Sequence, residues 1–221
     1  VALLEVLTSL ADVASRYGYV KPIVDDSSVI DIKEGRHPAV EQMIGEGLFV
    51  SNSTLLDTVS RSMLIITGPN MSGKSTYMRQ TAIIVLMAQI GSFVPCEHAY
   101  IGAVDRVFTR IGASDNLSHG QSTFYIEMSE LANILRNATE RSLIILDEIG
   151  RGTSTFDGLS IAWATIEFLS KPGNCIRTMF ATHYHELTVL ENKYSNIKNL
   201  SVAVSEQGSD IVFLHKISEQ P

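Results

Sequence analysis

Apolar residues recur at two different spacings along this chain, and the first spacing is helical. From Leu3 to Tyr17 they fall every three or four positions, and Gly18 follows. This pattern predicts an amphipathic helix that ends at the glycine. Neither an N-cap residue nor a methionine precedes it, so we expect the chain to be part of a longer protein. Residues 19–47 show only short polar–apolar alternations broken by prolines, which favours short antiparallel strands.

Continuous apolar runs dominate the chain from residue 63 onward. The runs are Met63–Ile66, Leu143–Leu146 and Thr178–Thr182, and each is typical of a strand buried on both faces. A further strand is predicted at residues 106–111, and helices are predicted over residues 74–90, 124–135 and 159–169. Alternating strands and helices predict an α/β fold with a mostly parallel central sheet flanked by helices.

The C-terminal region adds a β-hairpin to this sheet. Residues 200–204 and 211–214 form two short strand-like runs, and the turn-forming residues Gln207-Gly-Ser-Asp210 lie between them. Two such runs around a glycine-containing turn are typical of antiparallel strands. We therefore expect an added antiparallel β region beside the parallel strands.

Composition places the chain among ordinary globular proteins. Of its 221 residues, 45% are hydrophobic and 19% are charged. No apolar run reaches the ~18 residues of a membrane-spanning helix, and the N-terminus lacks the basic segment of a signal peptide. Cys96 and Cys175 are too few for a disulfide scaffold, and no Cys or His cluster has zinc-binding spacing. The net charge of −7 argues against a free-standing nucleic-acid binder, which is usually basic.

Residues 68–75 carry a phosphate-binding pattern. Their sequence, Gly-Pro-Asn-Met-Ser-Gly-Lys-Ser, fits the complete Walker A consensus and stands between a predicted strand and a predicted helix. The glycines let backbone N–H groups turn toward phosphate oxygens, and the helix N-terminus adds positive charge. In such a loop Lys74 reaches the β- and γ-phosphates, and the Ser75 hydroxyl binds Mg²⁺. The pattern therefore predicts a site for ATP or ADP with Mg²⁺.

A pair of acids follows the second apolar run. Asp147 ends the predicted strand, where a nucleotide site needs a carboxylate for Mg²⁺, and Glu148 comes next. Neighbouring residues at a strand end point in different directions, so Glu148 can act as the base for an attacking water. Taken alone, the pair is equally compatible with a solvated strand end. Beside a Walker A loop, the catalytic interpretation is favoured.

Two further features stand where nucleotide sites collect their ligands. Ser122 and Thr123 begin a predicted helix, whose N-terminus can bind a second anion; a simple N-cap is the alternative. His183 follows the third apolar run, and α/β folds gather ligand groups beyond the carboxyl ends of their strands. Its imidazole can hydrogen-bond a γ-phosphate or the attacking water. The alternative is a surface histidine at a strand end.

Longer stretches around these motifs resemble the bacterial DNA mismatch-repair ATPases of the MutS family. The resemblance extends over the whole chain, and Gly35-Arg-His-Pro38 belongs to the same pattern. The other matching segments are Thr67-Gly-Pro-Asn-Met-Ser-Gly-Lys-Ser-Thr76, Gln121-Ser-Thr-Phe-Tyr-Ile-Glu-Met128, Leu146-Asp-Glu-Ile-Gly-Arg-Gly-Thr-Ser-Thr155 and Ala181-Thr-His-Tyr184.

This resemblance implies a P-loop NTPase of the ABC-ATPase type. Residues 1–17 would be the tail of preceding lever helices, and residues 18–221 would be a Mg²⁺-dependent ATPase domain. Its nucleotide state would gate a clamp around DNA. The nucleotide-binding residues would be Gly68, Pro69, Asn70, Met71, Ser72, Gly73, Lys74, Ser75 and Thr76, with Glu148, His183 and Lys74 catalytic and with Ser75 and Asp147 on the metal.

The resemblance also assigns residues outside the Walker A loop. Asn70 would lie near the γ-phosphate, and Ser122 would reach the γ-phosphate bound by a second subunit. The loop at residues 151–157 would cross between the two sites. Phe49 and His215 would sandwich adenine; the alternative is that Phe49 is a core residue and His215 lies at a solvated strand end.

The expected partners are a second copy of this domain, a downstream MutL-type protein, and mismatched DNA bound through domains outside this chain. We expect a cytoplasmic, nucleoid-associated protein with no membrane partner. One alternative is a transporter-type ABC ATPase, because residues 117–121 look like its signature box. Ile-Gly-Arg after Glu148, where transporters have a proline-led loop, argues against it. The other alternative is a non-catalytic dimerisation module, which the joint presence of Lys74, Ser75, Asp147 and Glu148 argues against.

Overall fold

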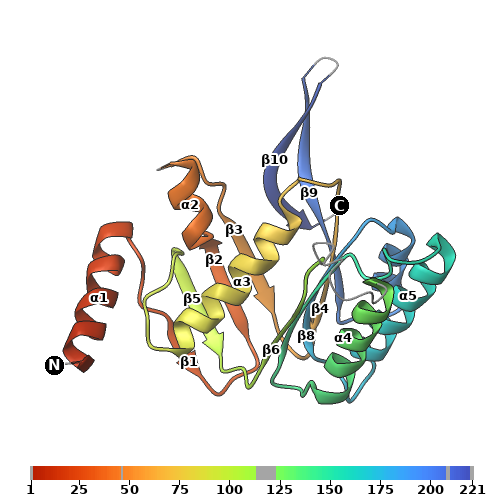
Figure 1. Ribbon diagram of the computed structural model, residues 1–221, viewed down its shortest axis with the longest axis horizontal. Helices are drawn as coiled ribbons and strands as arrows, with labels where there is room; N and C mark the ends of the chain where they lie inside the picture. Colours follow the sequence, from red (N-terminus) through yellow and green to blue (C-terminus); the bar gives the residue numbers. More distant parts are fainter. Residues whose placement is uncertain (1, 46, 113–122, 208–209, 220–221) are drawn as a thin grey trace.

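The computed structural model describes residues 2–45, 47–112, 123–207 and 210–219. It is a mixed α/β structure with two sheets (Figure 1). The six-stranded sheet has the order β10-β9-β4-β8-β7-β6 and the four-stranded sheet the order β1-β5-β2-β3. The expected combination of a mostly parallel sheet and an antiparallel β region is therefore confirmed.

The centre of the six-stranded sheet consists of the three apolar runs. β4 (Met63–Thr67), β7 (Leu143–Asp147) and β8 (Arg177–Thr182) are buried along their whole length. They lie parallel, with β8 between the other two, and β6 (Val107–Arg110) extends the sheet beside β7. The predicted hairpin is β9 (Ile197–Gln207) and β10 (Asp210–Glu219), and it continues the sheet on the other side of β4.

Helices cover both faces of this sheet because its apolar residues alternate between two cores. Leu64 and Ile66 pack in the core that includes α3 (Lys74–Gln89). Met63 and Ile65 pack in the core that includes α4 (Thr123–Asn137) and α5 (Thr155–Ser170). The three predicted helices are thus confirmed. A 3₁₀ helix, η2 (His185–Asn192), follows β8 and has no counterpart in the sequence-based prediction.

The second sheet has four strands, which come from the N-terminal region and from β5. It packs against the side of α3 opposite the six-stranded sheet. Its strands are β1 (Ile23–Asp25), β5 (His98–Gly102), β2 (Ile30–Gly35) and β3 (Asn52–Leu56). Short strands were expected over residues 19–47, and β2 pairs antiparallel with β3 and β5. The parallel pairing of β1 with β5 departs from that expectation. α3 contacts strands of both sheets, and Figure 1 shows it running diagonally across the molecule between them.

One short helix in this region was not predicted. α2 (Pro38–Ile44) has a proline at its start, and the Val40 backbone N–H donates to Nδ1 of His37 at 3.4 Å. Proline is favoured at the first helical position, but histidine is not one of the usual N-cap residues. Its seven residues are fewer than the roughly 11–18 over which helical periodicity is read, so the sequence pattern did not reveal it.

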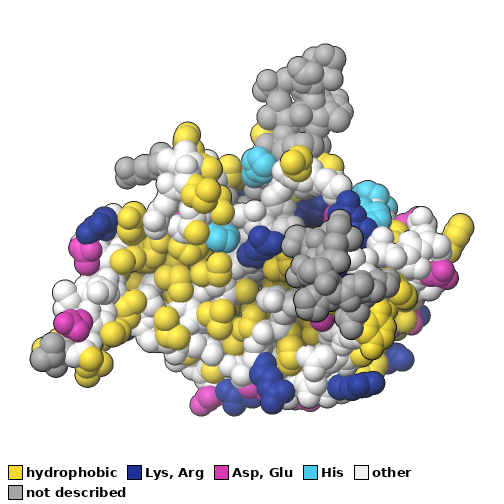
Figure 2. All heavy atoms as spheres, viewed as in Figure 1, with side chains coloured by type: hydrophobic (Ala, Val, Ile, Leu, Met, Phe, Trp, Pro, Cys, Tyr) yellow, Lys and Arg dark blue, Asp and Glu magenta, His cyan; other side chains and the backbone are white. Residues whose placement is uncertain are grey.

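The N-terminal helix α1 (Ala2–Tyr17) stands away from both sheets (Figure 1). Gly18 ends it with a φ of 61°, as the sequence predicts. Ala14 is its one buried residue within the described range, whereas Leu3, Leu4 and Leu7 are exposed. Figure 2 shows hydrophobic side chains gathered on the face that carries α1 and α3. The assignment of α1 to a preceding lever stays a prediction.

A buried arginine joins the two sheets. Arg177 begins β8 and is 1% exposed. Its guanidinium donates to the carbonyl oxygens of Gly102 at 3.1 Å and Arg141 at 2.5 Å. Burial lowers the pKa of Arg177 to about 10. The side chain therefore ties the end of β5 to the beginning of β8 and of β7 through main-chain acceptors.

Candidate functional site

The predicted phosphate-binding loop opens onto a cleft of about 570 Å³. Its walls come from α2, the segment that leads into β3, the loop before α3 and the beginning of α3. The ends of β6 and β7 and His215 on β10 complete them. The lining residues are Val40, Ile44, Leu48, Phe49, Val50, Asn52, Asn70, Met71, Ser72, Gly73, Lys74, Ser75, Thr76, Tyr77, Arg79, Gln80, Ile111, Gly112, Asp147, Glu148, Arg151 and His215.

The N-terminus of α3 faces this cleft without a side-chain cap. Gly73 is the N-cap residue and has a φ of 102°, in the left-handed region that favours glycine. Within the described part of the chain, no side chain hydrogen-bonds to the N–H groups of the first turn. The buried Ser72 hydroxyl likewise has no hydrogen-bond partner there. Uncapped N–H groups and the helix dipole together favour an anion at this position.

Lys74 supplies the positive charge of the cleft. Its ammonium donates to the carbonyl oxygens of Gly68 at 2.6 Å and Pro69 at 2.8 Å, so the side chain folds back over the loop. The residue is 5% exposed. Burial lowers the pKa of Lys74, and the charges of Glu148 and Asp147 oppose that shift. A phosphate anion beside this ammonium would offset the cost of burying it.

Asp147 and Ser75 form an oxygen pair at the end of β7. The Ser75 hydroxyl donates to Oδ2 of Asp147 at 2.5 Å. Burial raises the pKa of Asp147, and the hydrogen bond from Ser75 opposes the shift. A divalent cation in contact with this carboxylate would favour its charged form.

Glu148 occupies a strained position next to this pair. Its φ of 54° is left-handed, and its N–H donates to the carbonyl of Ala181 at 3.0 Å. Its carboxylate accepts from Arg151 at 2.6 Å; the Glu148 side chain is 16% exposed and that of Arg151 66%. Left-handed non-glycine residues cluster at functional sites. The mostly exposed arginine leaves one side of this ion pair open to solvent.

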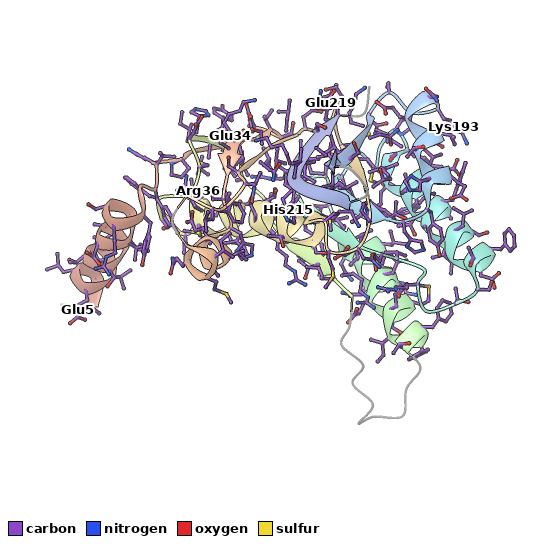
Figure 3. The ribbon with its side chains drawn as sticks, turned by 90° about the horizontal axis from the view of Figure 1, so that it is seen from above. Glu5, Glu34, Arg36, Lys193, His215 and Glu219 are labelled. Carbon is purple, nitrogen blue, oxygen red and sulfur yellow. The ribbon has the colours of Figure 1, made fainter. Side chains whose placement is uncertain are left out.

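Phe49 and His215 line the same cleft although they are far apart in sequence. His215 has a φ of 53°, and its Nδ1 lies 2.9 Å from the carbonyl oxygen of Ser72. A carbonyl only accepts, so Nδ1 carries the proton. Figure 3 shows His215 beside α3. The structure thus brings together the two residues predicted to hold adenine, while adenine binding itself stays a prediction.

The remaining predicted residues fall in three groups. Asn70, Met71 and Thr76 line the cleft together with residues 72–75, whereas Gly68 and Pro69 are not among its described lining and contact Lys74 through their carbonyl oxygens. His183 is exposed, its ring centroid lies 4.2 Å from that of Tyr184, and it is not among the described residues that line the cleft. Ser122 lies outside the described residues.

Several lining residues were missed by sequence reasoning. Arg79 lies four positions after Ser75 on α3 and faces the same cleft, so helical periodicity would have found it. Asn52 gave no such signal, because its role depends on pairing between distant strands. Among the described residues, no group of three or more His, Cys, Asp or Glu side chains could hold a metal ion. Mg²⁺ requires fewer protein ligands than that.

The family described as MutS domain V matches residues 64–221. Similar curated proteins are named DNA mismatch repair protein MutS. That of Lachnoclostridium phytofermentans is 64% identical over 98% of this chain, that of Ruminiclostridium cellulolyticum 65% over 97%, and that of Acetivibrio thermocellus 62% over 98%. These matches cover 23%, 25% and 25% of the relatives, so the chain spans about a quarter of their length. Among the helices of the described residues, none has the length and apolar character needed to cross a membrane.

Proposed function

Since this chain belongs to the MutS family of DNA mismatch repair proteins, we propose that it is the part of such a protein that binds and hydrolyses ATP. One observation carries the proposal. The uncapped start of α3, the buried ammonium of Lys74 and the Ser75–Asp147 pair all line one cleft. This arrangement places positive charge and Mg²⁺-type ligands where a triphosphate needs both.

The backbone of residues 68–73 and Lys74 would bind the phosphates. Lys74 is held now by two carbonyl groups of its own loop, and these are neutral acceptors. A β- or γ-phosphate oxygen would bind the ammonium more strongly, because it carries a negative charge that attracts the ammonium in addition to accepting a hydrogen bond. The loop thereby keeps the ammonium within the cleft until an anion arrives.

The residues present fit a magnesium ion. Mg²⁺ prefers oxygen ligands and is usually bound by one or two protein groups together with water and substrate phosphates. Ser75 and Asp147 offer a hydroxyl and a carboxylate 2.5 Å apart, and they would hold the ion. When bound, Mg²⁺ neutralises charge on the phosphate oxygens.

Glu148 would accept the proton of the attacking water. Its backbone is fixed by Ala181, and its carboxylate is paired only with the exposed Arg151 among the described residues. The arginine of that pair is mostly exposed, so Arg151 can turn into solvent and leave the carboxylate of Glu148 free to accept from water. His183 remains a candidate for a contact to phosphate or water from the end of β8.

Phe49 and His215 would bind the adenine ring between them. The proton on Nδ1 of His215 is committed to the Ser72 carbonyl, which holds the imidazole beside the phosphate loop. Stacking on such side chains is worth about 1–3 kcal/mol per base and tolerates any base. The cleft would therefore recognise triphosphates more strictly than the identity of the base.

The whole protein would couple this ATPase to repair. We propose an ABC-type arrangement in which a second copy contributes Ser122 to each site and nucleotide state gates a clamp on mismatched DNA. Relatives of about four times this length carry the name DNA mismatch repair protein MutS, which supports a DNA-reading role for segments outside this chain. A MutL-type partner and a cytoplasmic, nucleoid-associated location complete the proposal.

The test is nucleotide binding by the full-length protein that contains this chain. We expect a fluorescent ATP analogue with Mg²⁺ to bind the unsubstituted protein and to lose productive binding in Lys74→Ala. Lys171→Ala is the matched control, since Lys171 is exposed at the end of α5. Equal affinity in all three proteins would contradict the phosphate-binding role.

A further inference from the structure

A buried carboxylate connects α4 to the segment that follows β7. Glu127 lies on α4 and is 5% exposed. Its Oε1 accepts the backbone N–H of Gly150 at 2.6 Å, and its Oε2 lies 3.6 Å from Nη2 of Arg110 on β6. Gly150 is two residues beyond Glu148. The carboxylate therefore binds one donor on the segment of Glu148 and one on the sheet edge.

Gly150 also has close neighbours on α5 and at the residue before η2. Its φ of 91° is left-handed, and a Cβ at this position would lie 2.6 Å from the backbone of Gly158 on α5. The Tyr184 hydroxyl lies 3.4 Å from the Gly150 carbonyl. Glu127 provides the strong contact to this peptide, because a carboxylate accepting from a backbone N–H makes a charge-assisted bond. The direction of the chain from Glu148 to Gly150 is thus determined by α4 on one side and by α5 on the other.

Arg110 does not depend on Glu127 alone. The arginine is 6% exposed, and its Nε lies 2.9 Å from Oε2 of Glu130. Its Nη1 also donates to the carbonyl of Ile111 at 3.0 Å. Glu130 is itself half exposed and has no contact to Gly150 in the described structure. Glu127 and Glu130 therefore share one cation but differ in their relation to the Glu148 segment.

From this geometry we propose that Glu127 is a positioning residue for the base Glu148. By holding the Gly150 N–H, it makes the orientation of the Glu148–Gly150 segment follow the position of α4. Burial and the contact to Arg110 fix the carboxylate itself. This inference rests on the proposed ATPase function, and it adds a connection between the sheet edge at Arg110, α4 and the site of hydrolysis.

The competing explanation is that Glu127 only neutralises a buried arginine. The two explanations differ in what a substitution changes. Loss of a neutralising charge lowers stability and affects Glu130 variants as well. Loss of a positioning contact lowers the hydrolysis rate while leaving phosphate binding intact, because Lys74 and the start of α3 do not contact Glu127.

The experiment compares three variants in the full-length protein: Glu127→Ala, Glu127→Gln and Glu130→Ala. We measure the affinity for ATP, the single-turnover hydrolysis rate and the melting temperature of each. We expect Glu127→Ala to lower the rate by about tenfold to a hundredfold, the size of effect that a small misplacement produces. Its affinity for ATP should stay within about twofold, as expected when the ground-state contacts are unchanged.

The other two variants separate positioning from neutralisation. Glu127→Gln restores an acceptor for the Gly150 N–H without the charge, so it should recover most of the rate. Glu130→Ala removes the other partner of Arg110 and should leave the rate near that of the unsubstituted protein. Equal loss of rate in Glu127→Ala and Glu130→Ala, or an unchanged rate in Glu127→Ala, would overturn the inference.

Two further cases have to be distinguished: a variant that does not fold and an unsubstituted protein that hydrolyses no ATP. If Glu127→Ala does not fold, Arg110→Met combined with Glu127→Met removes both buried charges, an exchange that is often neutral or stabilising. The double variant still leaves Gly150 without its acceptor and must show the same loss of rate. If the unsubstituted protein hydrolyses no ATP, the proposed function itself fails; if it does and both Glu127 variants match it, only the role of Glu127 is wrong.

Discussion

Five charged side chains line one cleft, and burial acts on two of them, Lys74 and Asp147, in opposite directions. It lowers the pKa of Lys74 and raises the pKa of Asp147, so each charge is disfavoured by desolvation and favoured by the other. Such a pair is more costly in the free protein than with Mg²⁺ and a phosphate beside it. Binding of Mg²⁺ and a nucleotide phosphate would therefore raise the free energy of unfolding of the protein.

Glu148→Gln should separate binding from hydrolysis. Lys74 would bind phosphate in the ground state, whereas Glu148 would act on water, so Glu148→Gln should retain ATP affinity and lose hydrolysis. Removing a general base commonly costs 10²–10⁴-fold in rate, about the loss we expect. Equilibrium binding and single-turnover hydrolysis provide the measurement. If ATP affinity falls equally in Glu148→Gln and Lys74→Ala, this division of roles is wrong.

Asp147→Asn should stabilise the nucleotide-free protein near neutral pH. The pKa of Asp147 is raised in the folded state. The contribution of Asp147 to the free energy of unfolding is therefore complete below its unfolded pKa of about 3.9. It is lost as the pH rises through the folded pKa, where the buried side chain becomes charged. An amide avoids this penalty and still accepts from Ser75. A gain of 1 kcal/mol corresponds to about 2–4 °C in melting temperature for a domain of this size.

The same variant should lose the extra stabilisation that Mg²⁺ gives to the ATP complex. Thermal unfolding scans at neutral and acidic pH, with and without Mg²⁺ and ATP, measure both effects. The advantage of Asp147→Asn should shrink as the pH falls, because wild-type Asp147 is then protonated too. A lower melting temperature than wild type at neutral pH would contradict the account.

Strands that are continuous apolar runs could be predicted from the sequence. Strands that are stabilised by pairing with distant segments could not. Continuous apolar runs sufficed for β4, β7 and β8, because strands covered on both faces leave no polar positions. β5 (His98–Gly102) is short and has no such run, and it is stabilised by pairing with β1 and β2. The contact of His215 with Ser72 depends likewise on a bulge in β10, which no local pattern encodes.

Asn52→Ala should weaken the adenine wall without changing the phosphate site. The Asn52 side chain donates to the His215 carbonyl at 2.9 Å and accepts from the Ile217 N–H at 2.7 Å, so β3 fixes the bulge that presents His215. Loss of a stacking contact worth 1–3 kcal/mol would weaken ATP binding by about 5- to 150-fold. Competition assays with ATP and with inorganic triphosphate measure the two parts separately.

The exposed Asn133 on α4 provides the control for Asn52→Ala. Asn133→Ala should leave both affinities unchanged, since its side chain contacts Asn137 on its own helix. Equal weakening of ATP and triphosphate by Asn52→Ala would show that the variant disturbs the loop at residues 68–73 instead. An unchanged ATP affinity would mean that His215 does not hold the base.

The described residues form two sheets joined through Arg177, together with the cleft that we propose as the nucleotide site. The chain's net charge of −7 opposes the DNA backbone, whose phosphates dominate protein–DNA affinity. The relatives that it matches are about four times longer. Both observations support our proposal that segments outside this chain recognise DNA, while this part binds the nucleotide.

We therefore predict that the isolated chain hydrolyses ATP weakly and does not distinguish mismatched from paired DNA. If Ser122 acts on the γ-phosphate of a second copy, hydrolysis by the isolated chain should rise more steeply than in proportion to its concentration, because two copies must meet. Titration of labelled duplexes at low salt, where electrostatic attraction is strongest, tests the second part. Tight, mismatch-selective binding by this chain alone would place DNA recognition within residues 1–221 and overturn the prediction, because no segment outside it could then be responsible.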